Sequence, residues 1–149
     1  MRSALGSLFV FSLVGWIGGA AFYSLLVLPI LFTRLAPSQA GAVAALIFPA
    51  YYYAGVAFGT IMLAVAVVEA ARRRAGWRAA AVVITIMLAC QAYAAFSLHP
   101  RMQALRQAPG GEPSFHRLHT RSVQLNSVVL AGGLYLVVAS GWLVGAKRS

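Results

Sequence analysis

Four stretches without a charged side chain dominate this 149-residue chain, and they are residues 5–33, 35–68, 79–98 and 122–146. Each stretch has at least 20 residues, and about 20 residues of α-helix cross the roughly 30 Å hydrocarbon layer of a bilayer. Strands of a membrane β-barrel would instead alternate between polar and apolar residues, and that alternation is missing. The sequence therefore predicts an all-α integral membrane protein, a bundle of four transmembrane helices.

The composition agrees, because 61% of the residues are hydrophobic and only 9% are charged. Soluble domains carry closer to a quarter charged residues, so most of this surface must face lipid. In a soluble protein the net charge of +10 would suggest a nucleic-acid partner. Here the arginines stand at the ends of the apolar stretches, where they meet water and anionic headgroups. We expect membrane lipids as partners and no nucleic acid.

The second stretch is too long for one upright span. Its 34 residues would reach about 50 Å as a single helix, at 1.5 Å per residue. Pro49 offers a break, because proline removes a helical hydrogen bond and clashes with the preceding turn. We predict a short surface helix over residues 38–47 and a span that starts near Pro49. The chain then forms a single domain, with spans at about residues 5–33, 49–71, 79–98 and 116–146.

The basic residues predict the orientation of the bundle. Four helices put both termini on one side, together with the short loop that carries Arg72, Arg73, Arg74 and Arg78. Seven of the 12 arginine and lysine residues fall on that side and five on the other. Because loops rich in arginine and lysine stay in the cytoplasm, both termini are predicted to be cytoplasmic. We expect the protein in the cytoplasmic (inner) membrane of a bacterium.

Polar residues are concentrated in residues 99–126, between the third and fourth spans. This segment holds all three histidines and Glu112, one of only two acids. Pro100 suits the first turn of a short amphipathic helix outside the membrane, and residues 108–113 form a proline- and glycine-rich turn. Ser114 can then cap the fourth helix. With both termini in the cytoplasm, the segment would lie on the outer side.

One face of the fourth helix carries polar residues from this segment into the bilayer. Phe115, His119, Ser122 and Asn126 follow one another at spacings of three or four residues, so they share that face. Exposed polar groups are costly in lipid, so we expect the face to point into the bundle. It either binds a small anion or lipid headgroup, with arginines supplying charge-assisted bonds, or it only links the helices through hydrogen bonds. The candidate binding residues are Tyr51, Arg101, Arg117, His119, Ser122 and Asn126, with Arg121 expected beside them.

Pairs of glycines four residues apart occur in three of the four spans, at Gly15/Gly19, Gly55/Gly59 and Gly141/Gly145. Small residues at this spacing let another helix backbone approach closely, which drives association in lipid. Most of these pairs are expected to pack the bundle itself. The alternative is contact between copies in a homo-oligomer, or contact with a larger membrane complex.

Three elements of the chain resemble a known family. They are Phe48-Pro49-x-Tyr51, Pro100-Arg101 and Phe115-x-Arg117-x-His119-x-x-Ser122-x-x-x-Asn126. Across its whole length the chain looks like a member of the transmembrane protein 205-like family, also called domain of unknown function 4149. The resemblance implies four helices with a long loop between the last two, and no settled biochemical activity. Eukaryotic members are associated with resistance to platinum drugs. Animal members open the first helix with a histidine, which this chain lacks over residues 8–14.

The only two acids of the sequence are Glu69, at the end of the second span, and Glu112, in the loop before the fourth. The apolar stretches therefore lack the carboxylates that an active site or an ion-driven transporter would use, which argues against both. We therefore expect a non-enzymatic protein with a binding, transport-related or accessory role and no resident cofactor. The alternative is a protein that handles copper or haem b through His99, His116 and His119. Trp16-Ile17-Gly18-Gly19 with Leu28-Pro29 supports this alternative, because that stretch resembles helices of copper-resistance D-type membrane proteins.

Overall fold

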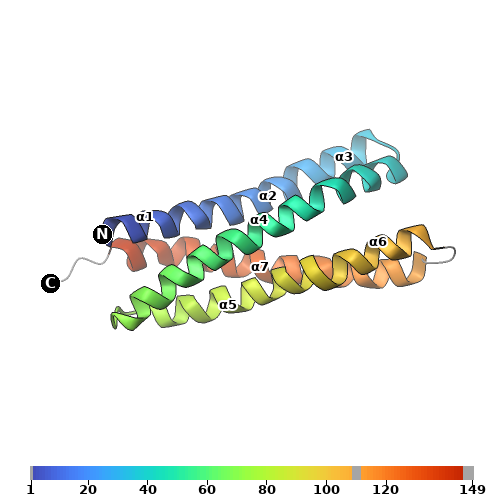
Figure 1. Ribbon diagram of the computed structural model, residues 1–149. Helices are drawn as coiled ribbons and strands as arrows, with labels where there is room; N and C mark the ends of the chain where they lie inside the picture. The colour runs from blue at the N-terminus through green and yellow to red at the C-terminus, as the bar shows by residue number, and fades with distance from the viewer. Residues whose placement is uncertain (1, 109–111, 146–149) are drawn as a thin grey trace.

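The computed structural model describes residues 2–108 and 112–145, which are almost entirely helical and contain no strand. They form four long helical rods, each long and apolar enough to cross a membrane (Figure 1). The first rod combines α1 (Arg2–Leu13), the π-helical turn η1 (Val14–Gly18), α2 (Gly19–Phe22), the π-helical turn η2 (Tyr23–Val27) and α3 (Leu28–Arg34). The second rod is α4 (Pro37–Ala71), the third combines α5 (Trp77–Tyr93), the π-helical turn η3 (Ala94–Leu98) and α6 (His99–Gln107), and the fourth is α7 (Glu112–Gly145). The predicted four-helix integral membrane protein is confirmed.

The expected break at Pro49 is wrong, because α4 continues through this proline as one helix. Pro49 lacks the N–H that would bond the carbonyl oxygen of Ala45, four residues earlier. In the structure the side-chain amide of Gln103, on α6, donates to that oxygen with an Nε2 to O distance of 3.5 Å. Transmembrane helices tolerate proline when a neighbouring helix supplies the missing partner in this way. No separate surface helix forms over residues 38–47.

Two of the π-helical turns end two residues before a proline. Pro29 follows η2 and Pro100 follows η3, and each proline is near the start of the next α-helical segment. A π-helical turn is wider than an α-helical turn and shifts the backbone hydrogen bonds by one residue. Each proline, which has no N–H to donate, therefore lies where the backbone hydrogen bonds change from the π-helical to the α-helical pattern. The short helix expected after His99 is present as α6, and it continues the third rod directly (Figure 1).

The interior of the bundle is apolar over most of its length, and its largest fully buried side chains include Phe9, Leu13, Met62, Trp77 and Leu136. The glycine pair of α4 lies inside this core. A methyl group on Gly55 would come within 2.8 Å of the Trp16 indole nitrogen, and one on Gly59 within 2.7 Å of the same ring. This pair therefore serves packing within the bundle, as predicted. Methyl groups on Gly141 and Gly145 would meet no described atom within 4 Å.

Glu69 closes the turn between α4 and α5, with only 2% of its side chain exposed. Arg72 donates to one carboxylate oxygen at 2.7 Å and Arg74 donates to the other at 3.0 Å. Arg73 lies between these two residues and takes the left-handed backbone conformation, with a φ of 56°. The carboxylate thus neutralises part of the basic loop and holds its backbone against the end of α4.

The two halves of the bundle separate at one end (Figure 1). The end of α3 and the start of α4 form one arm there, and α6 with the start of α7 forms the other. The opposite end of the bundle holds Arg2, the turn between α4 and α5, and Gly145. The described chain therefore starts and finishes at the same end, as an even number of spans requires.

Candidate functional site

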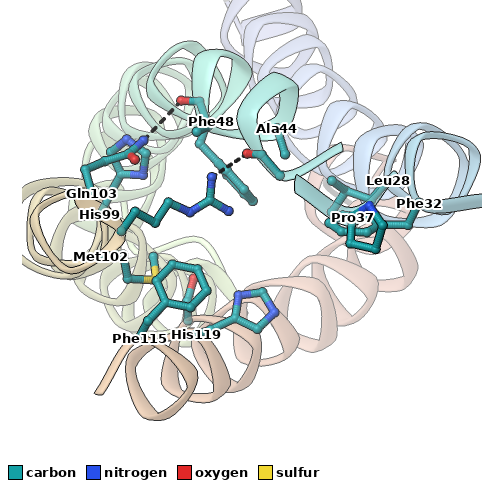
Figure 2. A pocket seen from close by; sticks show the side chains of 14 residues that line it. Leu28, Phe32, Pro37, Ala44, Phe48, His99, Met102, Gln103, Phe115 and His119 are labelled. Atoms are coloured by element: carbon teal, nitrogen blue, oxygen red, sulfur yellow. Dashed lines mark hydrogen bonds between the residues drawn. The ribbon is translucent and has the colours of Figure 1, made fainter. Parts of the chain in front are cut away.

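A cavity of about 290 Å³ lies between the two separated arms, and we call it the end cavity (Figure 2). The wall formed by α3 and α4 is mostly apolar and includes Leu28, Phe32, Ala44 and Phe48. The wall formed by α6 and α7 also carries polar side chains, and these are His99, Gln103, Arg106, His119 and Ser122. The end cavity is therefore amphipathic, and the described residues that line it are apolar, neutral polar or basic.

Arg106 joins α6 to α4 across the end cavity. Its Nη1 donates to the carbonyl oxygen of Gly41 at 2.6 Å, and its guanidinium carbon lies 5.0 Å from the centre of the Phe115 ring. A methyl group on Gly41 would come within 2.9 Å of Nη2, so this glycine makes room for the guanidinium. A guanidinium carries five N–H donors, so Arg106 can bind an anion while it keeps its bond to Gly41.

Aromatic rings hold the two histidines of the end cavity. The centre of the His99 ring lies 5.8 Å from that of Tyr52 and 6.1 Å from that of Phe48. His119 stacks on Phe115, one turn earlier in α7, with ring centres 6.0 Å apart and planes 7° from parallel. Stacked and edge-to-face ring pairs add about 0.5–1.5 kcal/mol to the effect of burial alone. This packing orients both imidazoles in the cavity wall.

A network of hydrogen bonds begins at the edge of the end cavity and runs deeper into the bundle. The Tyr52 hydroxyl pairs with that of Ser122 at 3.0 Å. The Tyr51 hydroxyl donates to Asn126 Oδ1 at 2.5 Å, and Asn126 Nδ2 donates to the Ser24 hydroxyl at 3.3 Å. These bonds connect η2, α4 and α7. Ser122 and Asn126 thus face the bundle interior, as their spacing predicted.

Arg101 and Arg117 lie away from the end cavity. Together with Arg121 they line a separate groove on the outside of α6 and α7, over an apolar floor. At about 100° per residue, Arg117 and Arg121 are turned by 100° or more from His119 and Ser122 around α7. The expected convergence of these arginines beside His119 and Asn126 is wrong for that reason. Of the candidate binding residues, His119 and Ser122 line the end cavity, and Tyr51 and Asn126 form the network beneath it.

The three candidate metal ligands do not come together. His99 and His119 line the end cavity, and His116 lines a different surface depression beside Pro113 and Arg117. Within residues 2–108 and 112–145, no group of three or more His, Cys, Asp or Glu residues is arranged to hold a metal ion. The cavity does contain Met102 as a further soft donor beside the two histidines.

Several residues of the site were not among the predicted ones, and they include Ser24, Phe48, Tyr52, Gln103 and Arg106. The sequence spacing could have identified Gln103 and Arg106. His99, Gln103 and Arg106 are spaced by four and then three residues, so they share one face of a helix that begins at His99. The partners of Tyr52 and Ser24 depend on which helices touch, and periodicity does not carry that information.

Comparison with known proteins adds the family. No curated protein and no solved structure matches the chain. The family described as "Domain of unknown function (DUF4149)" matches residues 11–109. The match runs from α1 through α6 and includes Gly41, His99 and Arg106 of the end cavity. Because it covers about two thirds of the sequence, this four-helix membrane protein belongs to the DUF4149 family.

Proposed function

We propose that this protein binds, within the membrane, a small amphipathic molecule whose anionic group enters the end cavity. The observation that carries the proposal is the position of Arg106, whose guanidinium stands in a cavity with an apolar opposite wall. An anion near a guanidinium gains charge-assisted hydrogen bonds, which are stronger than bonds between neutral groups. The apolar residues of α3 and α4 would hold the hydrocarbon part of the same molecule.

The size and the chemistry of the end cavity both favour a small ligand that is bound rather than converted. Its volume of about 290 Å³ is just below the roughly 300–1,000 Å³ that is usual for small-molecule sites, so a small ligand fits best. Among the described residues that line the cavity, the one hydroxyl is that of Ser122, which pairs with Tyr52. A serine nucleophile would instead need a base within hydrogen-bond distance. A transport-related or accessory role is consistent with such a binding site.

The direct test is binding of dodecanoate, a twelve-carbon carboxylate, to the purified full chain in neutral detergent, measured by calorimetry and native mass spectrometry. We expect one dodecanoate per chain, with its uncharged methyl ester at least about tenfold weaker because the charge-assisted bonds are lost. Arg106→Gln should weaken dodecanoate by a similar factor. Arg34→Gln is the matched control, since it removes an exposed arginine at the end of α3 that does not line the cavity. Equal affinity of Arg106→Gln and the native chain would contradict the proposal.

A second candidate function is supported by His99, His119 and Met102, which line the same cavity. Imidazole and thioether groups are ligands for copper, and histidines also ligate haem b. Titration of the purified chain with copper(I) or haem b tests this candidate. A stoichiometric complex that is lost in both His99→Ala and His119→Ala would support copper or haem handling. If neither copper(I) nor haem b binds and dodecanoate does, the result would favour the amphipathic anion as the ligand.

We also infer the setting of the protein in the cell. The chain is proposed to lie in a bacterial inner membrane with both termini in the cytoplasm, so that the end cavity faces outward. The support is the short loop that carries Arg72, Arg73, Arg74 and Arg78, since such loops stay on the cytoplasmic side. We also propose that the chain is similar to the transmembrane protein 205-like members, and the support for this is the sequence motif that runs from Phe115 to Asn126. The native mass spectra above also report a second copy or another bound protein.

A further inference from the structure

The groove formed by the outer faces of α6 and α7 is lined by three arginines. Arg101 comes from α6, and Arg117 and Arg121 are one turn apart on α7. The groove has a volume of about 480 Å³ and is separate from the end cavity. The two sites use different faces of the same two helices, so a ligand in one leaves the other open.

The groove combines positive charge with an apolar floor. Ala104, Leu105 and Leu118 form that floor, and the Ser114 hydroxyl lies at one side, where it accepts a hydrogen bond from Arg117 at 3.2 Å. Within the part of the chain that the structure describes, the salt bridges are those of Glu69, at the opposite end of the bundle. Arg117 and Arg121 repel each other at a spacing of four residues, and an anion between them would offset that cost.

The length of α7 places the groove at the level of the lipid headgroups. Its 34 residues extend about 51 Å at 1.5 Å per residue, whereas the hydrocarbon layer is roughly 30 Å thick. The uncharged part of α7 starts at Ser122 and continues to the C-terminal end of the helix, so this part crosses the hydrocarbon layer. The first two to three turns, which carry Ser114, Arg117 and Arg121, therefore extend beyond it. Arginines at this depth meet lipid phosphates directly, and the apolar floor continues toward the acyl chains.

We propose that this groove binds the phosphate of an anionic glycerophospholipid from the surrounding leaflet, with Arg101, Arg117 and Arg121 as its ligands. Guanidinium groups bind phosphate oxygens through paired, charge-assisted hydrogen bonds. The acyl chains of the lipid lie along Leu105 and Leu118. The site is independent of the amphipathic ligand proposed for the end cavity.

The test is native mass spectrometry of the full chain in neutral detergent, titrated with dioleoyl phosphatidylglycerol or with the zwitterionic dioleoyl phosphatidylcholine. We expect one phosphatidylglycerol to be retained at least about tenfold more tightly than phosphatidylcholine. Replacing all three groove arginines, Arg101→Gln with Arg117→Gln and Arg121→Gln, should abolish that preference. The matched control replaces Arg34, Arg73 and Arg78 with Gln, which removes the same charge elsewhere and should keep the preference.

Additional variants and a competition experiment distinguish lipid binding from a general charge effect and from binding of free phosphate. Replacing the three groove arginines with Lys keeps the charge and the fold but loses the paired bonds, so the preference should fall in part. Equal retention of both lipids by the native chain, or an unchanged preference in the Gln variant, would overturn the proposal. Displacement of phosphatidylglycerol by equimolar inorganic phosphate would also overturn it, because the site would then take the free ion. Dodecanoate binding should persist in the Gln variant, and phosphatidylglycerol binding should persist in Arg106→Gln, so each proposal fails separately.

Discussion

Asn126 links more of the structure than any other polar side chain in the site. Its amide accepts a hydrogen bond from Tyr51 on α4 and donates one to Ser24 in η2, so one residue of α7 connects three of the four rods. Periodicity alone placed Asn126 on an interior face of the last span. It left open whether the amide binds a ligand or only joins helices, and the hydrogen bonds to Tyr51 and Ser24 favour the second role.

Replacing Asn126 with Ala should lower the stability of the bundle in detergent by about 1 kcal/mol, since interhelical hydrogen bonds in membranes average about 0.6 kcal/mol. Chemical unfolding followed by circular dichroism measures the loss. Ser127→Ala is the matched control, because that exposed hydroxyl bonds only the Val123 carbonyl of its own helix. Unchanged stability of Asn126→Ala would show that the amide has no structural role and would return it to the candidate ligand contacts.

At the scale of the element, α4 shows how a helix survives an internal proline. The carbonyl of Ala45 loses its backbone partner at Pro49, and Gln103 replaces that partner from α6. One turn earlier, Arg106 bonds the Gly41 carbonyl from the same face of α6. These two bonds hold α6 against α4 beside the end cavity. The sequence contains Pro49, which favours a break in α4. The contact with α6 shows why the helix continues, because Gln103 supplies the missing hydrogen bond.

Pro49→Ala should raise stability by on the order of 1 kcal/mol, because the restored N–H can bond the Ala45 carbonyl. Gln103→Ala should then cost less in the Pro49→Ala background than in the native chain. We expect a coupling of about 0.5–1 kcal/mol between the two substitutions in a double-mutant cycle of unfolding free energies. Strictly additive effects would show that Gln103 does not compensate for the proline.

At the scale of the whole molecule, the four rods lie close together at one end and separate into two arms at the other (Figure 1). The packed end includes Phe9, Trp77 and Leu143, which are all buried. The open end carries both the end cavity and the arginine groove. Both proposed binding sites thus lie at the same end of the bundle, and the side of the membrane that this end faces decides which compartment they would serve.

Labelling of single cysteines should show which side that is. In a Cys90→Ala background, Ser38→Cys places an exposed thiol at the open end and Ala75→Cys places one in the opposite turn. With both termini cytoplasmic, a membrane-impermeant maleimide should label residue 38 in intact spheroplasts, and residue 75 only after permeabilisation. The reverse pattern would turn the end cavity and the groove toward the cytoplasm.

The sequence by itself determined the fold class, the number of spans and the inward face of the last helix. These are local properties, because the length and the hydrophobicity of a segment decide whether it crosses a bilayer. The sequence also brought His119, Ser122 and Asn126 onto one face, since a helix repeats every 3.6 residues.

Only the tertiary structure decided which residues meet. Arg106 reaches Gly41 and Gln103 reaches Ala45 because α6 packs beside α4, and the distance along the chain between these residues says nothing about that contact. The same packing turned Arg101 and Arg117 outward into a groove of their own. The register and rotation of each helix against its neighbours depend on the shapes of many side chains at once. The division of the basic residues between a cavity and a groove is therefore a property of the folded bundle.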